Sequence, residues 1–583
     1  MPNQSAQPAQ VAVADSPFLT DPFLQAPTQN SVRVVWFTEF EGTAHTVSYG
    51  EAGQEKSISA ATTQLSRTRE DEKSQVVGEP YETVTARSIW RHEAEITGLT
   101  PGERLPYRAM SIKEDGELIT SELFSLAPTP VAGQPLKILL TSDHQLMPMT
   151  AANLQKVKET VGQVDAVFLA GDLVNVPDRA SEWFDDARGG AFFPCLQGRA
   201  SFALEKDGQT TTYRGGQLIQ NAPLFPAVGN HEVMGRYSET LPLNDQFNDP
   251  VPWAAAKQFY EQNTKVFNPN NDPKLQRDWL KNNSFNIDTY NEIFSLPKAA
   301  RPDGAETQRY YATSFGDIRL VSLYVTQIWR TPNLAPKAKG RYREKQADIN
   351  NPMNWGYGQH IFEGIHKGSP QYRWLEQELA SEAFQQARYK VVMLHHPPHT
   401  LGDNIVPAFT NPVRVFDRHP DGSLKAVRYE YPKDQDYIIR DLVPLLEQYG
   451  VQLVYYGHSH VWNRFESPSG THFLESSNVG NTYGAHLEGN PRPVPQLKVG
   501  EGLEPFQENY VAIGDPNELD AIAPTLAPLT DDEDRPLPYI ASNDITAFSI
   551  FETATGTVSS YYFDTRQPDS EVVRFDEFTL APG

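Results

Sequence analysis

The sequence of 583 residues contains a single cysteine, Cys195. One thiol can form neither an intrachain disulfide nor a zinc site built from several thiolates. Any metal ion that this chain binds must therefore be held by histidine, carboxylate and amide side chains.

Long apolar runs are also missing. No stretch of about 18 consecutive apolar residues occurs, so we expect no helix that spans a membrane. Residues 1–30 are polar and rich in Gln, Pro and Ala, without the basic and apolar segments of a secretory signal. This pattern favours a cytoplasmic location and leaves a periplasmic or secreted one open.

Positive charge is scarce as well. Lys and Arg number 50 against 74 Asp and Glu, which gives a formal net charge of −24 at pH 7. Such a chain repels nucleic-acid backbones and anionic lipid surfaces, so neither is expected as a partner. A small anionic molecule would also be repelled at long range, unless bound metal ions supply local positive charge.

The chain is too long for one ordinary hydrophobic core, so two or more domains are expected. Residues 1–29 are polar, contain proline and show no periodicity, which predicts a flexible arm. Residues 30–130 predict a small all-β sandwich. The short strand-like segments behind this prediction lie at 31–37, 46–49, 92–97 and 107–110.

After a proline-containing linker at 130–135, strand and helix patterns alternate, which predicts an α/β layered domain over 136–583. Strands are predicted at 136–141, 164–170, 224–228, 390–394, 451–456, 546–551 and 559–563, and helices at 151–162, 371–386 and 442–448. Segments rich in Pro, Asn, Asp and Gly are predicted to be loops around the strand ends: 178–222, 235–305, 328–370, 400–436 and 480–540. For the acidic run 531–534 in the last of them, a solvated loop is favoured over a calcium site.

Five short clusters each follow an apolar strand, where α/β proteins place ligand sites. Together they hold seven of the 14 histidines, a concentration that scattered core or surface histidines would not show. The clusters are Ser142-Asp143-His144-Gln145, Gly171-Asp172-Leu173-Val174-Asn175, Gly229-Asn230-His231-Glu232, His395-His396-Pro397-Pro398-His399 and Gly457-His458-Ser459-His460.

These residue types suit a pair of metal ions acting on a phosphate ester. Phosphoryl oxygens repel a nucleophile, and two cations about 3.5–4 Å apart neutralise that charge and lower the pKa of a bound water. The pair needs a bridging carboxylate, neutral imidazoles and an amide oxygen. Glycines before Asp172, Asn230 and His458 let the backbone turn sharply, so that these side chains face one point.

The order Asp, Gly-Asp, Gly-Asn-His-Glu, His, Gly-His-x-His resembles the calcineurin-like metallophosphoesterase superfamily, and within it the purple acid phosphatases and their bacterial relatives. Segments 31–36 and 96–107 resemble the fibronectin-III-like N-terminal domain of that family, and segments 310–323, 371–379 and 451–464 resemble its catalytic domain. The resemblance implies a four-layer α/β/β/α sandwich over 136–583, preceded by the β-sandwich over 30–130.

The resemblance also implies a role for each matching residue. The ligands of the binuclear metal centre would be Asp143 and His460 on the first ion, Asp172 bridging both, and Asn230, His395 and His458 on the second. His231 would contact the phosphoryl oxygen and protonate the leaving alkoxide. Glu232 would orient or tune His231, and His399 would help to bind phosphate.

Two positions depart from the family pattern. The superfamily commonly has histidine two residues after the first aspartate, where this chain has Gln145. Purple acid phosphatases have a tyrosine three residues after the bridging aspartate, where this chain has Asn175. The remaining ligand of the first metal is thus open among Gln145, Asn175 and His144, with Gln145 favoured.

The metal ions are expected to be two divalent or mixed-valence ions, among Mn, Zn, Fe and Ca, because the first site is rich in oxygen. Either His395 or His396 could be the ligand on the second ion, and His395 is favoured because the family's ligand precedes the proline by two residues.

Three functions remain open. The favoured one is a phosphomonoesterase of the acid phosphatase kind, with a small phosphorylated substrate, a metal-bound hydroxide as nucleophile and His231 as general acid. The second is a phosphodiesterase that acts on cyclic nucleotides or glycerophosphodiesters. The third is a binding protein whose first metal site has degenerated.

Overall fold

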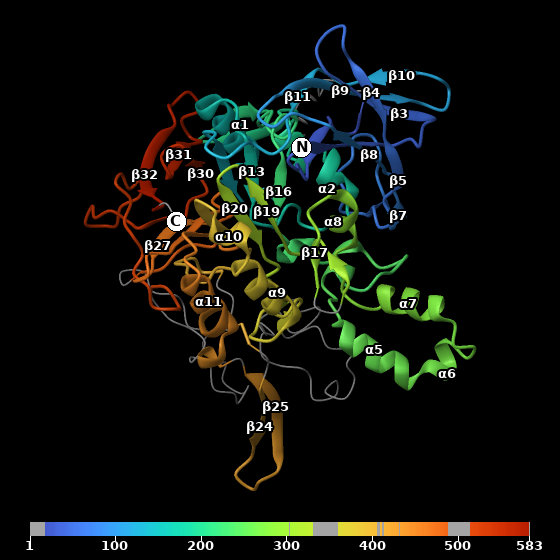
Figure 1. Ribbon diagram of the computed structural model, residues 1–583. Coiled ribbons are helices and arrows are strands. Elements are labelled where there is room, and N and C mark those ends of the chain that lie inside the picture. The colour runs from blue at the N-terminus through green and yellow to red at the C-terminus, as the bar shows by residue number, and fades with distance from the viewer. Residues whose placement is uncertain are drawn as a thin grey trace, which may run out of the picture.

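The computed structural model describes residues 18–301, 304–329, 359–404, 409–410, 413–430, 432–487 and 514–581. Figure 1 shows a β-domain at one end of the molecule and a larger α/β domain beside it. None of the helices among the described residues combines the length and the apolar character that a membrane crossing needs.

The N-terminal domain is the predicted all-β sandwich. One sheet has the order β1 (Phe23–Gln25), β2 (Ser31–Thr38), β8 (Trp90–Thr97) and β5 (Ala61–Gln64). The other has the order β10 (Leu118–Thr120), β9 (Leu105–Ile112), β3 (Ala44–Tyr49) and β4 (Lys56–Ser59), with β11 (Phe124–Leu126) paired to β9. Trp36, Val47 and Tyr107 are buried between the sheets, as the alternating pattern requires.

The flexible arm predicted over 1–29 is wrong at its C-terminal end. Strand β1 pairs antiparallel with β2, with Phe23 opposite Val35, and Phe23 is buried against the α/β domain. The segment is short and rich in Pro and Gln, so its sequence did not show that it completes a sheet edge. Residues 1–17 lie outside the described part of the chain.

Two sheets form the centre of the α/β domain. The six-stranded sheet has the order β16 (Leu224–Pro226), β13 (Ala166–Leu169), β12 (Lys137–Thr141), β30 (Ile545–Glu552), β31 (Thr557–Asp564) and β32 (Val573–Thr579). The seven-stranded sheet has the order β19 (Tyr311–Phe315), β20 (Ile318–Ser322), β23 (Tyr389–Met393), β26 (Leu453–Tyr456), β28 (His472–Ser476), β27 (Trp462–Glu466) and β29 (Tyr539–Ile540). Strands β12, β13 and β16 are parallel, as are β20, β23, β26 and β28, so the loops after them open at one edge of each sheet.

The two sheets face each other and helices cover their outer faces, which confirms the four-layer prediction. Trp462 Nε1 in β27 donates to Ser560 Oγ in β31 at 3.0 Å, across the sheets. Helix α1 (Thr150–Val161) lies on the first sheet, where Asn153 donates to the backbone of β30. Helices α9 (Pro370–Leu379), α10 (Glu382–Gln385) and α11 (Val443–Gln448) lie beside the second sheet (Figure 1).

The helix predicted over 371–386 is two helices, α9 and α10. Ser381 interrupts it, because its hydroxyl accepts from Phe384 N–H at 3.2 Å and starts a new helix. Helix α11 is preceded by a wider helical turn over Ile438–Leu442. The C-terminus adds β32 to the two strands that were predicted there.

Several of the predicted loops contain regular elements, so that prediction was wrong. Segment 178–222 holds α2 (Ala180–Phe184), α3 (Phe192–Leu196) and the hairpin β14 (Phe202–Lys206) with β15 (Gln209–Tyr213). Segment 235–305 holds α4 (Leu243–Phe247), α5 (Trp253–Gln262), α6 (Thr264–Phe267), α7 (Pro273–Asn282) and α8 (Asp288–Ile293), and β17 (Ala299–Ala300) pairs with β18 (Glu306–Thr307). Asp272 caps α7 through its side chain and Pro273 is the first residue of that helix, whereas the composition suggested loops.

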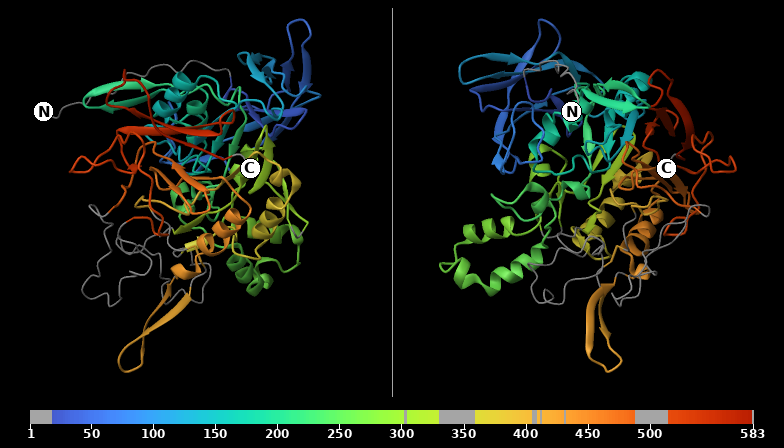
Figure 2. Two further views of the ribbon diagram at one scale, coloured as in Figure 1. Left: turned by 60° about the vertical axis from the view of Figure 1, so that its left-hand side comes forward. Right: turned by 180° about the vertical axis from the view of Figure 1, so that it is seen from behind.

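Two of these insertions project from the body. Helices α5 to α7 form an arm with a small core of its own around Tyr260 and Leu280 (Figure 1). The hairpin β24 (Val413–Arg418) and β25 (Leu424–Glu430) projects at the end opposite the β-domain, as both views in Figure 2 show. Strands β21 (Gln327–Trp329) and β22 (Gln359–Ile361) pair near the second sheet's loops. Much of segments 328–370 and 480–540 lies outside the described residues.

Candidate metal centre

All five predicted clusters meet where the loops of the two sheets converge. The loops after β12, β13 and β16 bring Asp143, Asp172 and Asn230 from one sheet. The loops after β23 and β26 bring His395, His396, His458 and His460 from the other. Two sets of side chains bring possible ligand atoms within 4.8 Å of one another inside each set. One set is His395, His396 and His458, and the other is Asp143, Asp172 and His395.

The backbone at the centre adopts an unusual conformation. Five of the predicted ligands have positive φ: Asp143 at 59°, Gln145 at 33°, Asp172 at 55°, His458 at 82° and His460 at 57°. Residues other than glycine rarely adopt this backbone conformation, and each one that does lowers the stability of the fold by about 1–3 kcal/mol. Strain of this kind is tolerated where the surrounding structure holds side chains in one arrangement for function.

Glycines next to the ligands are required by close approach as well as by turning. A Cβ atom on Gly457 would lie 2.2 Å from Asp143 Oδ2, and one on Gly229 would lie 2.3 Å from Asp172 Oδ1. Loops of the two sheets at Gly457, and neighbouring loops of one sheet at Gly229, therefore approach so closely that only glycine fits.

Asn230 lies at the centre of the second predicted metal site. Its Oδ1 is 3.0 Å from His458 Nδ1, 3.1 Å from His395 Nε2 and 3.2 Å from His396 Nε2. One amide oxygen and three imidazole nitrogens from three loops thus converge, as the side chains of a metal site do.

His395 and His396 differ in which ring nitrogen carries the proton. His395 Nδ1 lies 2.8 Å from the carbonyl oxygen of Ala170, which can only accept, so Nδ1 keeps its proton and Nε2 is the nitrogen that a metal ion could coordinate in place of a proton. His396 Nδ1 accepts from the backbone N–H of Gln327 at 3.0 Å, so the neutral ring carries its proton on Nε2. Because a metal ion needs a lone pair, these contacts favour His395 as the ligand.

The first predicted metal site lies around Asp143. Its carboxylate accepts from the backbone N–H of His458, and Oδ1 is 3.5 Å from His460 Nε2. His460 Nδ1 donates to the carbonyl oxygen of Asn481 at 3.1 Å, which leaves Nε2 facing Asp143 as the nitrogen that a metal ion could coordinate in place of a proton. Asp172 Oδ2 is 3.1 Å from His395 Nε2, so this carboxylate lies between the two sites.

The three candidates for the remaining ligand of the first metal differ in their contacts. Gln145 Nε2 donates to Asp172 Oδ2 at 2.9 Å. The Asn175 side chain donates to the carbonyl oxygen of Gln145 at 2.7 Å, and His144 Nε2 contacts Thr141 Oγ1 at 2.9 Å. Of the three side chains, Gln145 is thus the one that touches the bridging carboxylate, and it does so as a hydrogen-bond donor.

The electrostatics of the centre are those of a cation site. Burial alone would lower the pKa of His395, but Asp172 outweighs it and raises that pKa to about 10. Burial would likewise lower the pKa of His460, and Asp143 raises it. Burial lowers the pKa values of His396 and His458 well below the usual range, so both are neutral. Two carboxylates, neutral imidazoles and an amide oxygen match the donors that Zn, Mn and Fe prefer, so the residues fit a pair of such ions.

His231 lies beside this centre and is held at two points. Its backbone N–H donates to Asp172 Oδ1 at 2.8 Å, and its Nδ1 donates to the carbonyl oxygen of Asn175 at 2.7 Å. Its ring packs against Phe247 at a centroid distance of 5.2 Å. With Nδ1–H committed, Nε2 is the nitrogen that can take up or release a proton.

Glu232 and His399 have contacts that differ from those expected. The Glu232 carboxylate accepts from the backbone N–H groups of Gly229, Asp172 and Leu173 at 2.6, 2.9 and 2.7 Å, so it braces the two ligand loops. Burial, with the Asp172 carboxylate nearby, raises the pKa of Glu232 to about 8. His399 Nδ1 lies 2.7 Å from Asp515 Oδ2 and its ring packs on Phe473, contacts that account for its burial without a substrate.

Several residues at the centre carry no signal in the sequence. Ala170, Gln327 and Asn481 act through backbone atoms, which any residue type supplies. Tyr483 packs its ring on His460 at 5.2 Å. Glu475 is fully buried and accepts from Ser459 N–H at 2.8 Å, between the two histidines of the His-x-His turn. Ala170 adjoins a cluster but acts through its carbonyl oxygen, and the other four residues lie away from the clusters along the chain, so no local pattern marks them.

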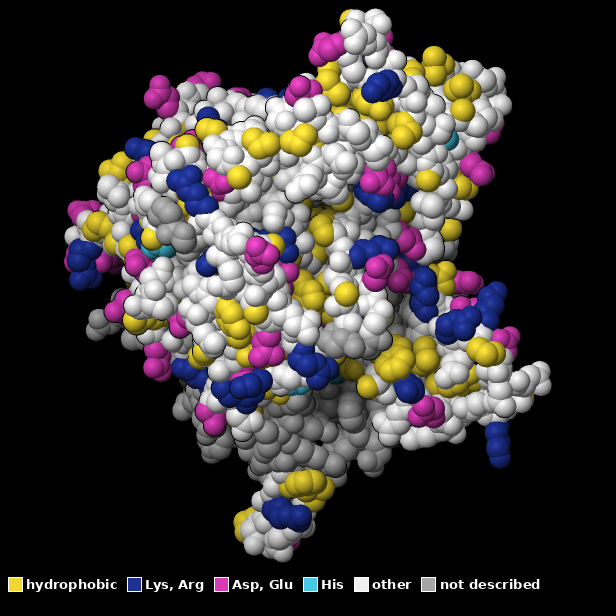
Figure 3. Space-filling view, in the orientation of Figure 1, with side chains coloured by type: hydrophobic (Ala, Val, Ile, Leu, Met, Phe, Trp, Pro, Cys, Tyr) yellow, Lys and Arg dark blue, Asp and Glu magenta, His cyan; other side chains and the backbone are white. Residues whose placement is uncertain are grey.

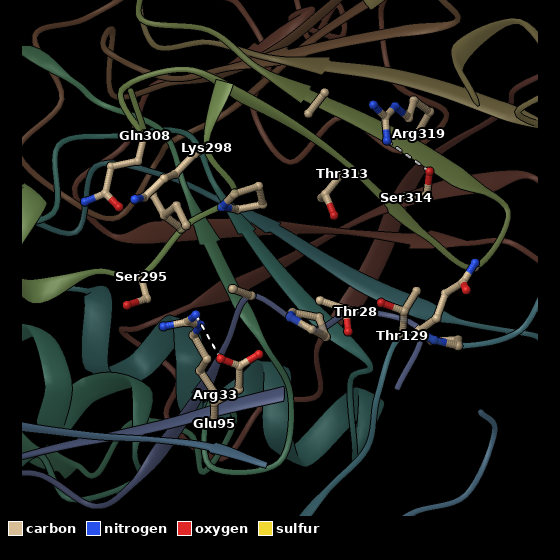
Figure 4. Close-up of a pocket in the computed structure, with 18 of the residues that line it drawn as sticks. Thr28, Arg33, Glu95, Thr129, Ser295, Lys298, Gln308, Thr313, Ser314 and Arg319 are labelled. Atoms are coloured by element: carbon tan, nitrogen blue, oxygen red, sulfur yellow. Dashed lines mark hydrogen bonds and ion pairs between the residues drawn. The ribbon is translucent and has the colours of Figure 1, made fainter. Parts of the chain in front are cut away.

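A concavity lies elsewhere, between the β-domain and the α/β domain (Figure 4). It has a volume of about 930 Å³. Its cations are paired with carboxylates: Arg33 with Glu95, Arg319 with Glu378 and Lys298 with Glu306. Acidic and basic side chains are also interspersed on the face seen in Figure 3. The chemistry therefore concentrates at the histidine and carboxylate centre.

Comparisons with known proteins agree with this architecture. Residues 136–462 match the family model of calcineurin-like phosphoesterases, and residues 22–126 match that of the purple acid phosphatase N-terminal domain. No curated protein matches the sequence. Among solved structures, purple acid phosphatase PPD1 from yellow lupin (Lupinus luteus) seeds is 14% identical, with a TM-score of 0.50 over 96% of this chain and 74% of that chain, which supports the fold.

Two further solved structures are more distant. A dimetal phosphatase from Danio rerio is 9% identical, with a TM-score of 0.29 over 76% of this chain and 98% of that chain. GAP50 of Plasmodium is 8% identical, with a TM-score of 0.30 over 76% of this chain and 90% of that chain. At these scores neither adds to the assignment.

Proposed function

The chain belongs to the calcineurin-like phosphoesterase family, and we propose that it is a two-metal phosphomonoesterase that acts on a small phosphorylated substrate. The observation that carries the proposal is the convergence of His395, His458 and Asn230 on one side of Asp172, and of Asp143 and His460 on the other. At each of the two sites, hydrogen bonds to the backbone orient ligand side chains: His395 is held by the Ala170 carbonyl, and His460 by the Asn481 carbonyl.

Two bound cations would neutralise the phosphoryl charge and lower the pKa of a coordinated water. The residues that would hold them are Asp143 and His460 at one site, Asn230, His395 and His458 at the other, and Asp172 between. His396, with its proton on Nε2, adds a neutral donor beside the second site. Because imidazoles dominate the second site, Zn, Mn and Fe suit it better than Ca, which takes oxygen ligands.

His231 is the proposed general acid. Its Nδ1–H stays on the Asn175 carbonyl, so the proton for the leaving alkoxide comes from Nε2. Asn175 stands where purple acid phosphatases carry their tyrosine, so we expect a centre without the tyrosinate–iron colour.

The test uses the purified full chain with Mn²⁺ or Zn²⁺. We expect hydrolysis of p-nitrophenyl phosphate and two metal ions per chain by elemental analysis. Asp172→Ala removes the bridging carboxylate and should abolish turnover; full activity in that variant would contradict the two-metal proposal. Faster turnover of bis-p-nitrophenyl phosphate than of the monoester would instead identify a diesterase, and one metal or none without turnover would identify a binding protein.

A further inference from the structure

We infer that Asp71, in the β-domain, is a positioning residue for His231 of the α/β domain. The inference rests on the proposed role of His231 as general acid. It starts from the two oxygens of one carboxylate, each of which begins a separate path of contacts that ends at the same imidazole.

Asp71 belongs to a charged run that the fold buries. Residues 67–71, Arg-Thr-Arg-Glu-Asp, are each at most 5% exposed. Strand β6 (Arg69–Glu70) of this run pairs with β7 (Thr85–Ala86) and lies along the loop after β13, where Arg69 N–H donates to the Asp178 carbonyl at 2.9 Å. Arg69 also pairs with the Asp178 carboxylate at 2.6 Å. Buried charges need partners, and these come from the other domain.

The first path leaves from Asp71 Oδ1. This oxygen accepts from Arg179 Nη2 at 2.9 Å. The same guanidinium donates through Nη1 to Glu182 Oε1 at 2.7 Å. All three side chains are buried, so the charges are held in one arrangement by one another.

Glu182 continues this path to the active site. Its Oε2 accepts from the backbone N–H groups of Asn175 at 2.6 Å and Val176 at 2.9 Å. The Asn175 carbonyl oxygen, in the peptide held this way, accepts from His231 Nδ1 at 2.7 Å. The direction of the His231 ring is therefore set by a peptide that Glu182 fixes.

The second path leaves from Asp71 Oδ2. This oxygen accepts at 2.8 Å from the backbone N–H of Leu243, the first residue of α4. Four residues later α4 presents Phe247, whose ring packs on the His231 ring. Leu243 and Phe247 share a small apolar cluster with Val84 of the β-domain. The β-domain thus supports both the hydrogen bond and the packing face of His231.

Asp71→Asn is the informative substitution. The side chain keeps its shape, but it loses its negative charge and one acceptor oxygen becomes an amide NH2 group, which can only donate. Whichever way the amide turns, its N–H groups face either Arg179 or the Leu243 N–H, so one path is broken. A matched control is Glu93→Gln, since Glu93 also bridges the domains, through Arg91 and the Ser295 hydroxyl, without a link to His231.

The experiment compares two monoesters. p-Nitrophenolate leaves without a proton, whereas an alkoxide such as that of glycerol 2-phosphate needs the general acid. We expect Asp71→Asn to lower kcat/KM for glycerol 2-phosphate relative to p-nitrophenyl phosphate by roughly tenfold, below the 10²–10⁴-fold range of complete loss of an acid. Two metal ions per chain should remain, and Glu93→Gln should leave the ratio unchanged.

Equal loss on both esters, or an unchanged ratio, in folded Asp71→Asn would overturn the inference. If Asp71→Asn does not fold, Glu182→Gln decides by the same ratio, since it weakens the hold on Asn175 directly. Failure of the unaltered protein to cleave either ester with two metals bound would overturn the proposed function itself, and the inference with it.

Discussion

His395 and His396 are adjacent in the sequence and both point an Nε2 atom at Asn230 Oδ1, yet Nδ1 donates a hydrogen bond in the first ring and accepts one in the second. The Ala170 carbonyl holds a proton on Nδ1 of the first, and the Gln327 N–H takes the Nδ1 lone pair of the second. A ring nitrogen that a metal ion could coordinate, in His395, and an N–H donor, in His396, therefore lie side by side at the second predicted metal site. The difference arises from the backbone behind each ring.

The different Nδ1 contacts of the two rings predict different metal contents for the variants His395→Ala and His396→Ala. His395→Ala should lose an ion, because it removes a lone pair directed at Asp172 and Asn230. His396→Ala should keep two ions and lose activity, because it removes only a hydrogen-bond donor. Elemental analysis after dialysis measures both, and the reverse pattern would show that His396 is the ligand.

Gln145→Ala should keep two metal ions per chain. Since Gln145 Nε2 donates to the bridging Asp172, its loss should weaken metal affinity by about 10- to 100-fold, as removal of a hydrogen bond to a ligand does. Competition with a chelator measures the affinity. A chain that retains only one ion would show instead that Gln145 is itself a ligand. Gln145→His, which restores the family's Asp-x-His spacing, is the companion variant and should bind the first ion more tightly.

Gly457→Ala should disrupt the first metal site. The added Cβ would lie 2.1 Å from Ser142 Oγ and 2.2 Å from Asp143 Oδ2, so the Asp143 carboxylate must move. We expect one ion to be lost and turnover to fall below detection. Gly450→Ala is the control: it has φ +69° but open space for a Cβ, so it should cost about 1 kcal/mol of stability and leave both ions bound.

The β-domain contains a pair of stacked histidines that should make the fold sensitive to acid. The rings of His45 and His92 lie 3.6 Å apart, and burial lowers the pKa of His92 from 6.5 to about 3. Between these two pKa values the unfolded chain binds a proton at His92 that the folded chain does not bind. The free energy of unfolding is therefore highest above the unfolded pKa and decreases as the pH falls below it.

For His92 alone this loss should reach about 2 kcal/mol of unfolding free energy at pH 5. His92→Asn should lower stability at neutral pH but reduce its further decline towards pH 5 by that amount. Urea unfolding at the two pH values measures it. An unaltered pH dependence in the variant would mean that His92 is already protonated in the folded chain.

The metal centre was predictable because its ligands follow strands directly. A residue two or three positions beyond a parallel strand must lie at that sheet's edge, so Asp143, Asp172 and His458 could be placed without knowing how the sheets pack. Glu232 and His399 lie in the same clusters, but Glu232 accepts a hydrogen bond from the Leu173 N–H and His399 contacts the Asp515 carboxylate. No local sequence pattern reveals these contacts.

The elements missed by the sequence analysis are those whose character depends on distant partners. The charged run 67–71 has the composition of an exposed loop, and it is buried because carboxylates and a guanidinium from residues 178–182 neutralise it. Helices in 235–305 were obscured by Asn and Pro that serve as caps and first-turn residues.

The amino-acid sequence by itself determined the two-domain order, the α/β alternation and the residue types of the metal centre, because periodicity and strand-end motifs are local properties. Only the tertiary structure decided which nitrogen each histidine offers, which carboxylates brace the loops and that the β-domain reaches His231. Those features depend on backbone carbonyls, N–H groups and buried charges that lie far apart along the chain and meet only when the domains pack.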